Sequence, residues 1–138
     1  MPSPLAERRL LQIVVATLAL VPILAGIAGI VLGPRGFDAA AVLSRSGDSH
    51  LRYLSGLMLA IGLAFWSTVP GIEAKGQRFR LLAGLVLIGG CARLYALATA
   101  GLPTPGMIGG LVMELLVTPG LALWRESVER KLAAAAPH

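Results

Sequence analysis

Residues 81–124 read LLAGLVLIGGCARLYALATAGLPTPGMIGGLVMELLVTPGLALW, and this stretch decides the fold. It contains two apolar runs, 81–100 and 107–124, separated by a short turn that holds Pro103 and Pro105. A helix of about 20 apolar residues, rising 1.5 Å per residue, crosses the hydrocarbon of a bilayer. The stretch therefore predicts two adjacent, antiparallel membrane helices joined by a stiff turn.

Each of these two apolar runs carries one charged residue, Arg93 in the first and Glu114 in the second. A charge near the centre of a bilayer costs about 2.5–3.5 kcal/mol on insertion scales, and such residues usually pair or serve a function. Arg93 lies eight residues before Gly101, and Glu114 lies seven residues after Met107. Both should then lie about 10–12 Å from the same end of the hairpin. The spacing predicts that the two side chains meet.

The composition of the whole chain matches that of an integral membrane protein. It has 138 residues, of which 56% are hydrophobic and 14% charged, whereas soluble domains carry about 25% charged residues. Windows of about 19 residues give four apolar segments, 10–32, 51–69, 81–100 and 107–124. We therefore expect an all-α fold, a single membrane domain over residues 1–138 built as a four-transmembrane-helix bundle. The connection 34–50 is its outer loop, and residues 125–138 form a tail whose end frays.

The distribution of basic residues predicts the orientation of this bundle. Eight lysines and arginines lie beside the N-terminus, in the second loop and beside the C-terminus, and three lie on the opposite side. The positive-inside rule then places both termini in the cytoplasm. The net charge of +5 is scattered over helix ends, so we expect no nucleic-acid partner. The first apolar run is longer than the core of a signal peptide, and we expect it to be retained as a helix.

Local signals predict details around the second and fourth helices. Residues 37–43 have the composition of a short surface helix, and the outer loop is either a plain connection or a lid. Asp48 or Ser49 is expected to cap the second helix. Pro119 and Gly120 should distort the fourth helix just beyond Glu114.

The polar residues of the outer half form a candidate site around Arg93 and Glu114. We expect Glu114 to act as general acid or base and Arg93 to hold an oxygen, with His50 relaying protons at the mouth. Candidate ligand contacts are Arg52, Tyr53, Gly89, Gly90, Gly110 and Thr118. This net positive set suits an anionic head group or a developing oxyanion. One histidine and one glutamate are poor material for a metal centre, so neither a metal nor a cofactor is expected.

Several short motifs, in this order and spacing, resemble a family of bacterial membrane proteins described as domain of unknown function 4345. They are His50-Leu51-Arg52-Tyr53, Gly89-Gly90-Cys91-Ala92-Arg93, Gly101-Leu102-Pro103 and Glu114, and the resemblance covers about Leu10 to Arg125. It implies a four-helix membrane fold, distantly similar to DoxX-like proteins, in the bacterial inner membrane. The resemblance also carries over the family's polar positions, which are His50, Arg52, Arg93 and Glu114 here. It implies no known activity.

Two functional hypotheses from different classes follow. In the first, the polar site binds or transforms a small lipophilic molecule of terpenoid, sterol or acyl type by acid–base chemistry. In the second, the chain is a non-catalytic membrane subunit or scaffold that docks another membrane protein, and Arg93–Glu114 is a structural ion pair. Membrane lipids are partners in either case, and the glycine faces suit a homo-oligomer or a membrane protein partner. The residues do not decide whether the chain is an enzyme.

Overall fold

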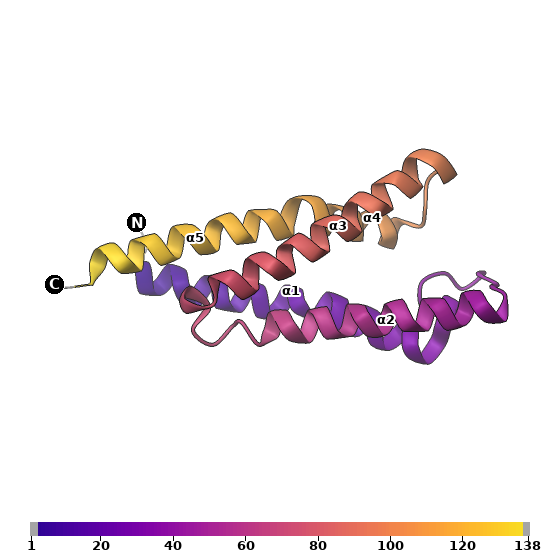
Figure 1. Ribbon diagram of the computed structural model, residues 1–138, viewed down its shortest axis with the longest axis horizontal. Helices are drawn as coiled ribbons and strands as arrows, with labels where there is room; N and C mark the ends of the chain where they lie inside the picture. Colours follow the sequence, from indigo (N-terminus) through magenta and orange to yellow (C-terminus); the bar gives the residue numbers. More distant parts are fainter. Residues whose placement is uncertain (1–2, 137–138) are drawn as a thin grey trace. The chain divides into compact units, whose positions relative to one another are not determined.

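The computed structural model describes residues 3–136, which form helices joined by turns and irregular connections, with no strand among them (Figure 1). The first three helices are α1 (Pro4–Leu32), α2 (Arg45–Trp66) and α3 (Gly76–Ala100). The remainder consists of α4 (Pro105–Val112), the π-helical stretch η3 (Met113–Val117) and α5 (Thr118–Ala135). Two 3-10 turns, η1 (Gly33–Gly36) and η2 (Ile72–Ala74), lie in the connections. The predicted all-α class is confirmed.

Three helical segments are long and apolar enough to cross a membrane. They are Pro4–Gly36, Gly76–Ala100 and Pro105–Ala135. The second predicted span, 51–69, is not among them, because α2 carries Arg45, Asp48, His50 and Arg52 in its first turns. The four-span bundle therefore stays a prediction.

The chain separates into two compact units. One unit combines the chain up to Ala16 with everything from Thr68 onward, and the other is Thr17–Ser67. Helix α1 begins in the first unit and continues into the second. The single domain over residues 1–138 stays a prediction, and each unit is described by itself below.

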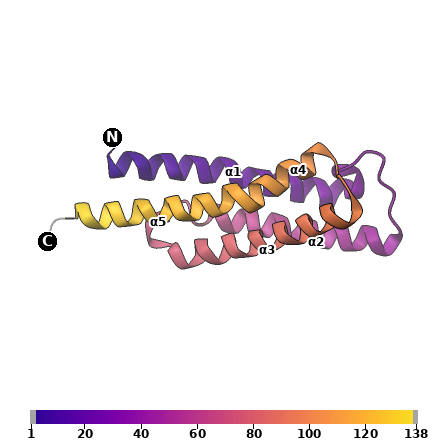
Figure 2. The same ribbon diagram turned by 90° about the horizontal axis from the view of Figure 1, so that it is seen from above.

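In the first unit, α3 packs against α4, η3 and α5. Figures 1 and 2 both show α3 and α5 running side by side. Phe79 and Leu82 of α3 and Val128 of α5 are buried, as is Ile72 of η2. Many other large apolar side chains on these helices are exposed, for example Ile88 at 68% and Leu116 at 68%. An apolar exterior of this kind suits lipid rather than water as the surrounding medium.

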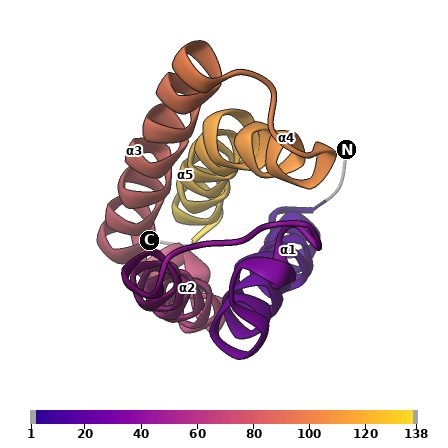
Figure 3. The same cartoon turned by 90° about the vertical axis from the view of Figure 1, so that its right-hand side faces the viewer.

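In the second unit, α1 approaches α2 closely. A Cβ built on Gly26 would lie 2.7 Å from the Leu59 backbone nitrogen, and one on Gly62 would lie 3.0 Å from the Ile23 backbone nitrogen. Small residues at such positions let membrane helices pack backbone to backbone. The connection from η1 to α2 is the long purple loop in Figure 3.

The start of α2 differs from the expectation. Ser44 is its N-cap and accepts a hydrogen bond from the Gly47 backbone nitrogen at 3.1 Å, so the expected caps Asp48 and Ser49 are wrong. The expected surface helix over 37–43 is also wrong, because this segment contains only turns and irregular backbone. A serine oxygen placed before the first free N–H groups satisfies one of them, which fixes the start of the helix earlier than the apolar run indicates.

The other helix ends also extend past the apolar windows. Helix α1 begins at Pro4 rather than at residue 10, and α3 begins at Gly76 rather than at residue 81. Helix α5 continues to Ala135, so the expected tail from residue 125 is helical over most of its length. Apolar windows detect the part of a helix that suits a membrane, whereas hydrogen bonding continues through polar turns. The final expected tail residues, Pro137 and His138, lie outside the described residues.

Arg125 fixes the polar end of the first unit. Its side chain is 1% exposed. Its Nε donates to the Ile72 carbonyl at 3.0 Å, Nη2 donates to the Glu73 carbonyl, and Nη1 donates to Glu129 at 2.9 Å. A Cβ on Gly76 would lie 2.4 Å from Arg125 Nη1, so a side chain at this position would have to displace the guanidinium. One arginine thus joins η2, the start of α3 and α5.

Replacing Arg125 should therefore destabilise the fold. Arg125→Met leaves the buried Ile72 carbonyl and the part-buried Glu73 carbonyl without donors, and we expect a loss of about 1–3 kcal/mol for the buried one. Arg130→Met is the matched control, because Arg130 is exposed and makes no ion pair among residues 3–136. Thermal unfolding of purified protein in detergent should show a lower midpoint for Arg125→Met only. Equal midpoints for the two variants would contradict this role.

Candidate functional site

The α3–α4 hairpin positions the candidate site. Gly101 ends α3 with a φ of +93°, which the L-residues rarely adopt, and Pro105 begins α4. Proline is favoured at the first helical position because its missing N–H would be unpaired there in any case. The two helices therefore turn back on one another over four residues, as the sequence predicts.

Within this hairpin, Arg93 and Glu114 form a two-pronged ion pair. Arg93 Nε donates to Glu114 Oε2 at 2.9 Å, and Arg93 Nη2 donates to Glu114 Oε1 at 3.0 Å. The predicted meeting of the two side chains is confirmed. Bidentate arginine–carboxylate contacts are directional and stronger than neutral hydrogen bonds. The Arg93 side chain is 31% exposed and that of Glu114 20%, so the pair is reachable from the surface of the first unit.

The third contact of Arg93 is a weaker one. Its Nη1 lies 2.7 Å from the Met107 sulfur of α4. A thioether is a poor hydrogen-bond acceptor, and methionine side chains adapt easily to new neighbours. The guanidinium therefore keeps donor capacity that a better acceptor, such as a carbonyl or carboxylate oxygen, could use.

Glu114 lies in the π-helical stretch η3. The Thr118 backbone N–H and its hydroxyl both donate to the Met113 carbonyl, the hydroxyl at 2.9 Å. Pro119 follows directly, and its ring has no N–H and collides with the carbonyl four residues back in a regular helix. The wider π turn relieves that conflict, and such turns are frequent at functional sites. The distortion expected from Pro119 is present, but it precedes the proline and includes Glu114.

The glycines near the pair differ in how closely other residues approach them. A Cβ on Gly90 would lie 2.8 Å from the Glu114 Cβ, so this glycine allows α3 to touch η3. A Cβ on Gly110 would lie 3.7 Å from Arg93 Cζ, which is ordinary contact. One on Gly89 would meet no described residue within 4 Å. The hydroxyl of Thr118 is engaged with backbone. Gly90 and Gly110 thus border the pair, and a ligand-binding role for Gly89 and Thr118 stays a prediction.

The remaining predicted site residues belong to the second unit and have contacts of their own. Arg52 bonds Asp48 at 2.8 Å and donates to the carbonyls of Ile30 and Val31 at the end of α1. A cation at a helix C-terminus meets carbonyls that have no partner inside the helix. Arg52 therefore closes the end of α1, and a ligand would have to compete with these contacts.

His50 and Tyr53 lie together on the exposed side of α2. Their rings stack with centroids 6.4 Å apart. With Arg45, Ser46 and Ser49 they line an open hollow of about 580 Å³. The predicted roles of His50 as a proton relay and of Tyr53 as a ligand contact stay predictions.

The sequence patterns do not indicate the contacts of two residues near the ends of this unit. Met107 contacts the guanidinium of the pair, and Arg125 was counted only as a topology signal. The seven-residue spacing from Met107 to Glu114 could have placed both on one helix face. Among the described residues, no group of three or more His, Cys, Asp and Glu side chains could hold a metal ion.

The different surroundings of Gly89 and Gly90 give a matched test of the hairpin. Gly90→Ala should push α3 away from η3 and lower stability by about 1–3 kcal/mol, the usual cost of overpacking. Gly89→Ala adds a methyl group in open space and should gain about 0.5–1 kcal/mol from helix propensity. Thermal unfolding of both variants checks this. A Gly90→Ala protein as stable as Gly89→Ala would mean that α3 and η3 do not touch as described.

Comparisons with known proteins give one match. A family model described as Domain of unknown function (DUF4345) matches residues 10–125, which include the hairpin and its ion pair. No curated protein and no solved structure matches the chain. The resemblance noted in the motifs is thereby confirmed: the chain belongs to the family Domain of unknown function (DUF4345).

Proposed function

We propose that this protein binds a small lipophilic molecule at the Arg93–Glu114 pair and transforms it by acid–base chemistry. The proposal rests on the bonding and exposure of the pair. Arg93 and Glu114 are joined by two hydrogen bonds, yet their side chains are 31% and 20% exposed on an apolar hairpin. A part-buried ion pair is weak evidence of net stabilisation, so joining the two helices does not by itself account for it. This one is open to a ligand arriving from the lipid.

The free bonding capacity of the pair indicates the chemistry of that ligand. Arg93 can give up the Met107 sulfur for a carbonyl, carboxylate or phenolic oxygen, because each is a better acceptor than a thioether. Each Glu114 oxygen accepts one bond from Arg93 and retains a further lone pair. The ligand is therefore a terpenoid, sterol or acyl compound with an oxygen at one end.

A proton shift within the ligand needs only these two residues. Arg93 would hold the ligand oxygen and stabilise negative charge that develops on it. In a ligand whose oxygen belongs to a carbonyl group, Glu114 would take a proton from the carbon next to that carbonyl and return it to another carbon. Such an isomerisation conserves all atoms.

We further propose four membrane crossings with both termini in the cytoplasm of a bacterial inner membrane. Gln12 donates to the Val69 carbonyl at 2.7 Å, and Glu7 pairs with Lys131. From Gln12 to Leu32, α1 rises about 30 Å, and the 22 residues of α2 provide a return of about 33 Å. This chain path supports α2 as the fourth span, and the excess of basic residues beside the termini supports the cytoplasmic side.

A scaffold role is the second candidate. Among residues 3–136, nothing lies within 4 Å of a Cβ built on Gly106 or Gly109 of α4. Open glycines on a membrane helix let a second helix approach closely. In this case the occupant is another membrane protein or a second copy, and Arg93–Glu114 only closes the hairpin.

Mass spectrometry of molecules retained after gentle extraction separates the two candidates. Per amount of folded protein, Glu114→Gln and Arg93→Gln should retain at least about tenfold less of the lipophilic molecule, because each loses a charge-assisted contact. Glu126→Gln is the control, since Glu126 is a carboxylate at the other end of the same helical segment and pairs with Arg80. Equal retention by all variants, or a stoichiometric protein instead of a small molecule, would contradict the proposal.

A further inference from the structure

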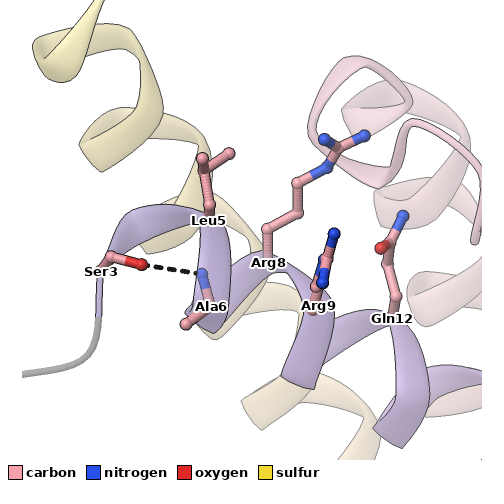
Figure 4. Close-up of a pocket in the computed structure, with 6 residues that line it drawn as sticks. All are labelled: Ser3, Leu5, Ala6, Arg8, Arg9 and Gln12. Carbon is pink, nitrogen blue, oxygen red and sulfur yellow. Dashed lines mark hydrogen bonds between the residues drawn. The ribbon is translucent and has the colours of Figure 1, made fainter.

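A hollow of about 410 Å³ lies beside the first turns of α1. Ser3, Leu5, Ala6, Arg8, Arg9 and Gln12 line it (Figure 4). All belong to the first unit. Arg8 and Arg9 directly precede the apolar run that begins at Leu10, so they lie where a membrane helix meets the lipid head groups.

The charges around this hollow are balanced except for Arg9. Glu7 is bound by Lys131 Nζ at 2.7 and 2.8 Å, and Glu73 lies 2.9 Å from Arg8. Among the described residues, Arg9 pairs with no carboxylate. The hollow therefore presents a positive charge that the protein itself does not neutralise.

The helix N-terminus and Gln12, which also border the hollow, already have hydrogen-bond partners within the protein. Ser3 Oγ already accepts a hydrogen bond from the Ala6 backbone nitrogen, as Figure 4 shows, so the helix terminus is capped. Gln12 is held in place by its bond to the Val69 carbonyl. Figure 4 shows the side chains of Arg8, Arg9 and Gln12 extending on the same side of α1.

An apolar stripe passes through Arg9. Leu5, Arg9 and Ile13 are four residues apart and so share one face of α1. Leu5 and Ile13 are each 62% exposed. A lone arginine between exposed apolar side chains matches a molecule that is anionic at one point and apolar elsewhere.

We infer that this hollow binds the phosphate group of an anionic glycerophospholipid. Arg9 supplies the main contact, since guanidinium groups match phosphate oxygens in a two-pronged geometry. Arg8 adds a second, partly neutralised guanidinium. The stripe of Leu5 and Ile13 covers the apolar part of the lipid. This site is separate from the Arg93–Glu114 pair and does not depend on the function proposed for that pair.

The test is titration of detergent-solubilised protein with phosphatidylglycerol, counting bound lipid by native mass spectrometry. Arg9→Gln should bind about fivefold more weakly, the effect of roughly 1 kcal/mol per basic residue near a lipid surface. Arg9→Lys, which keeps the charge but cannot make the two-pronged contact, should bind more tightly than Arg9→Gln and more weakly than the wild type. Arg130→Gln is the matched control, and it should bind as the wild type does. Arg9→Gln should unfold at the wild-type temperature because it breaks no ion pair among the described residues.

Three results would overturn the inference. The first is unchanged binding in Arg9→Gln. The second is an equal loss in Arg130→Gln, which would mean that only the total charge matters. The third is displacement of the lipid by the same concentration of glycerol 3-phosphate or inorganic phosphate, which would make a free phosphate the ligand. Retention of a lipophilic molecule at Arg93–Glu114 should be unchanged in Arg9→Gln, so the two sites are tested separately.

Discussion

The two hydrogen bonds between Arg93 and Glu114 are the constraint on which the hairpin depends. Each charge alone would cost about 2.5–3.5 kcal/mol in the middle of a membrane helix, so neither helix suits the bilayer without the other. Holding the carboxylate and guanidinium at 2.9 and 3.0 Å requires close helices, which Gly90 provides. It also requires Glu114 to face α3, and the π turn before Pro119 sets that direction.

The opposite end of the first unit uses its charges differently. Arg125 is almost completely buried and bonds two backbone carbonyls of η2 in addition to Glu129. The guanidinium is buried among these partners and offers no accessible donor to a ligand, so the role of Arg125 is to hold η2 against α5. Arg93 has a replaceable thioether contact and an exposed edge. Of the two arginines, only Arg93 is suited to binding a ligand.

The sequence was sufficient for the features that depend on hydropathy and helix geometry. The all-α class, the hairpin and the meeting of Arg93 with Glu114 all follow from apolar runs and a rise of about 1.5 Å per residue. The helix ends did not follow, because capping by Ser44 and hydrogen bonding through polar turns leave no mark in a hydropathy window. The partners of Arg52 and Arg125 are backbone carbonyls. Every residue has such a group, so no residue pattern identifies them.

The Arg93–Glu114 pair is proposed to bind a ligand in addition to joining two helices. The most direct measurement compares folded yield with retained lipophilic molecule in the exchanged protein, Arg93→Glu with Glu114→Arg. The exchange restores an ion pair but moves the guanidinium away from Met107 on α4 and the carboxylate out of the π turn. We predict that yield returns while retention of the molecule does not. Recovery of both yield and retention would contradict this binding role, because the position of each charge would then be immaterial.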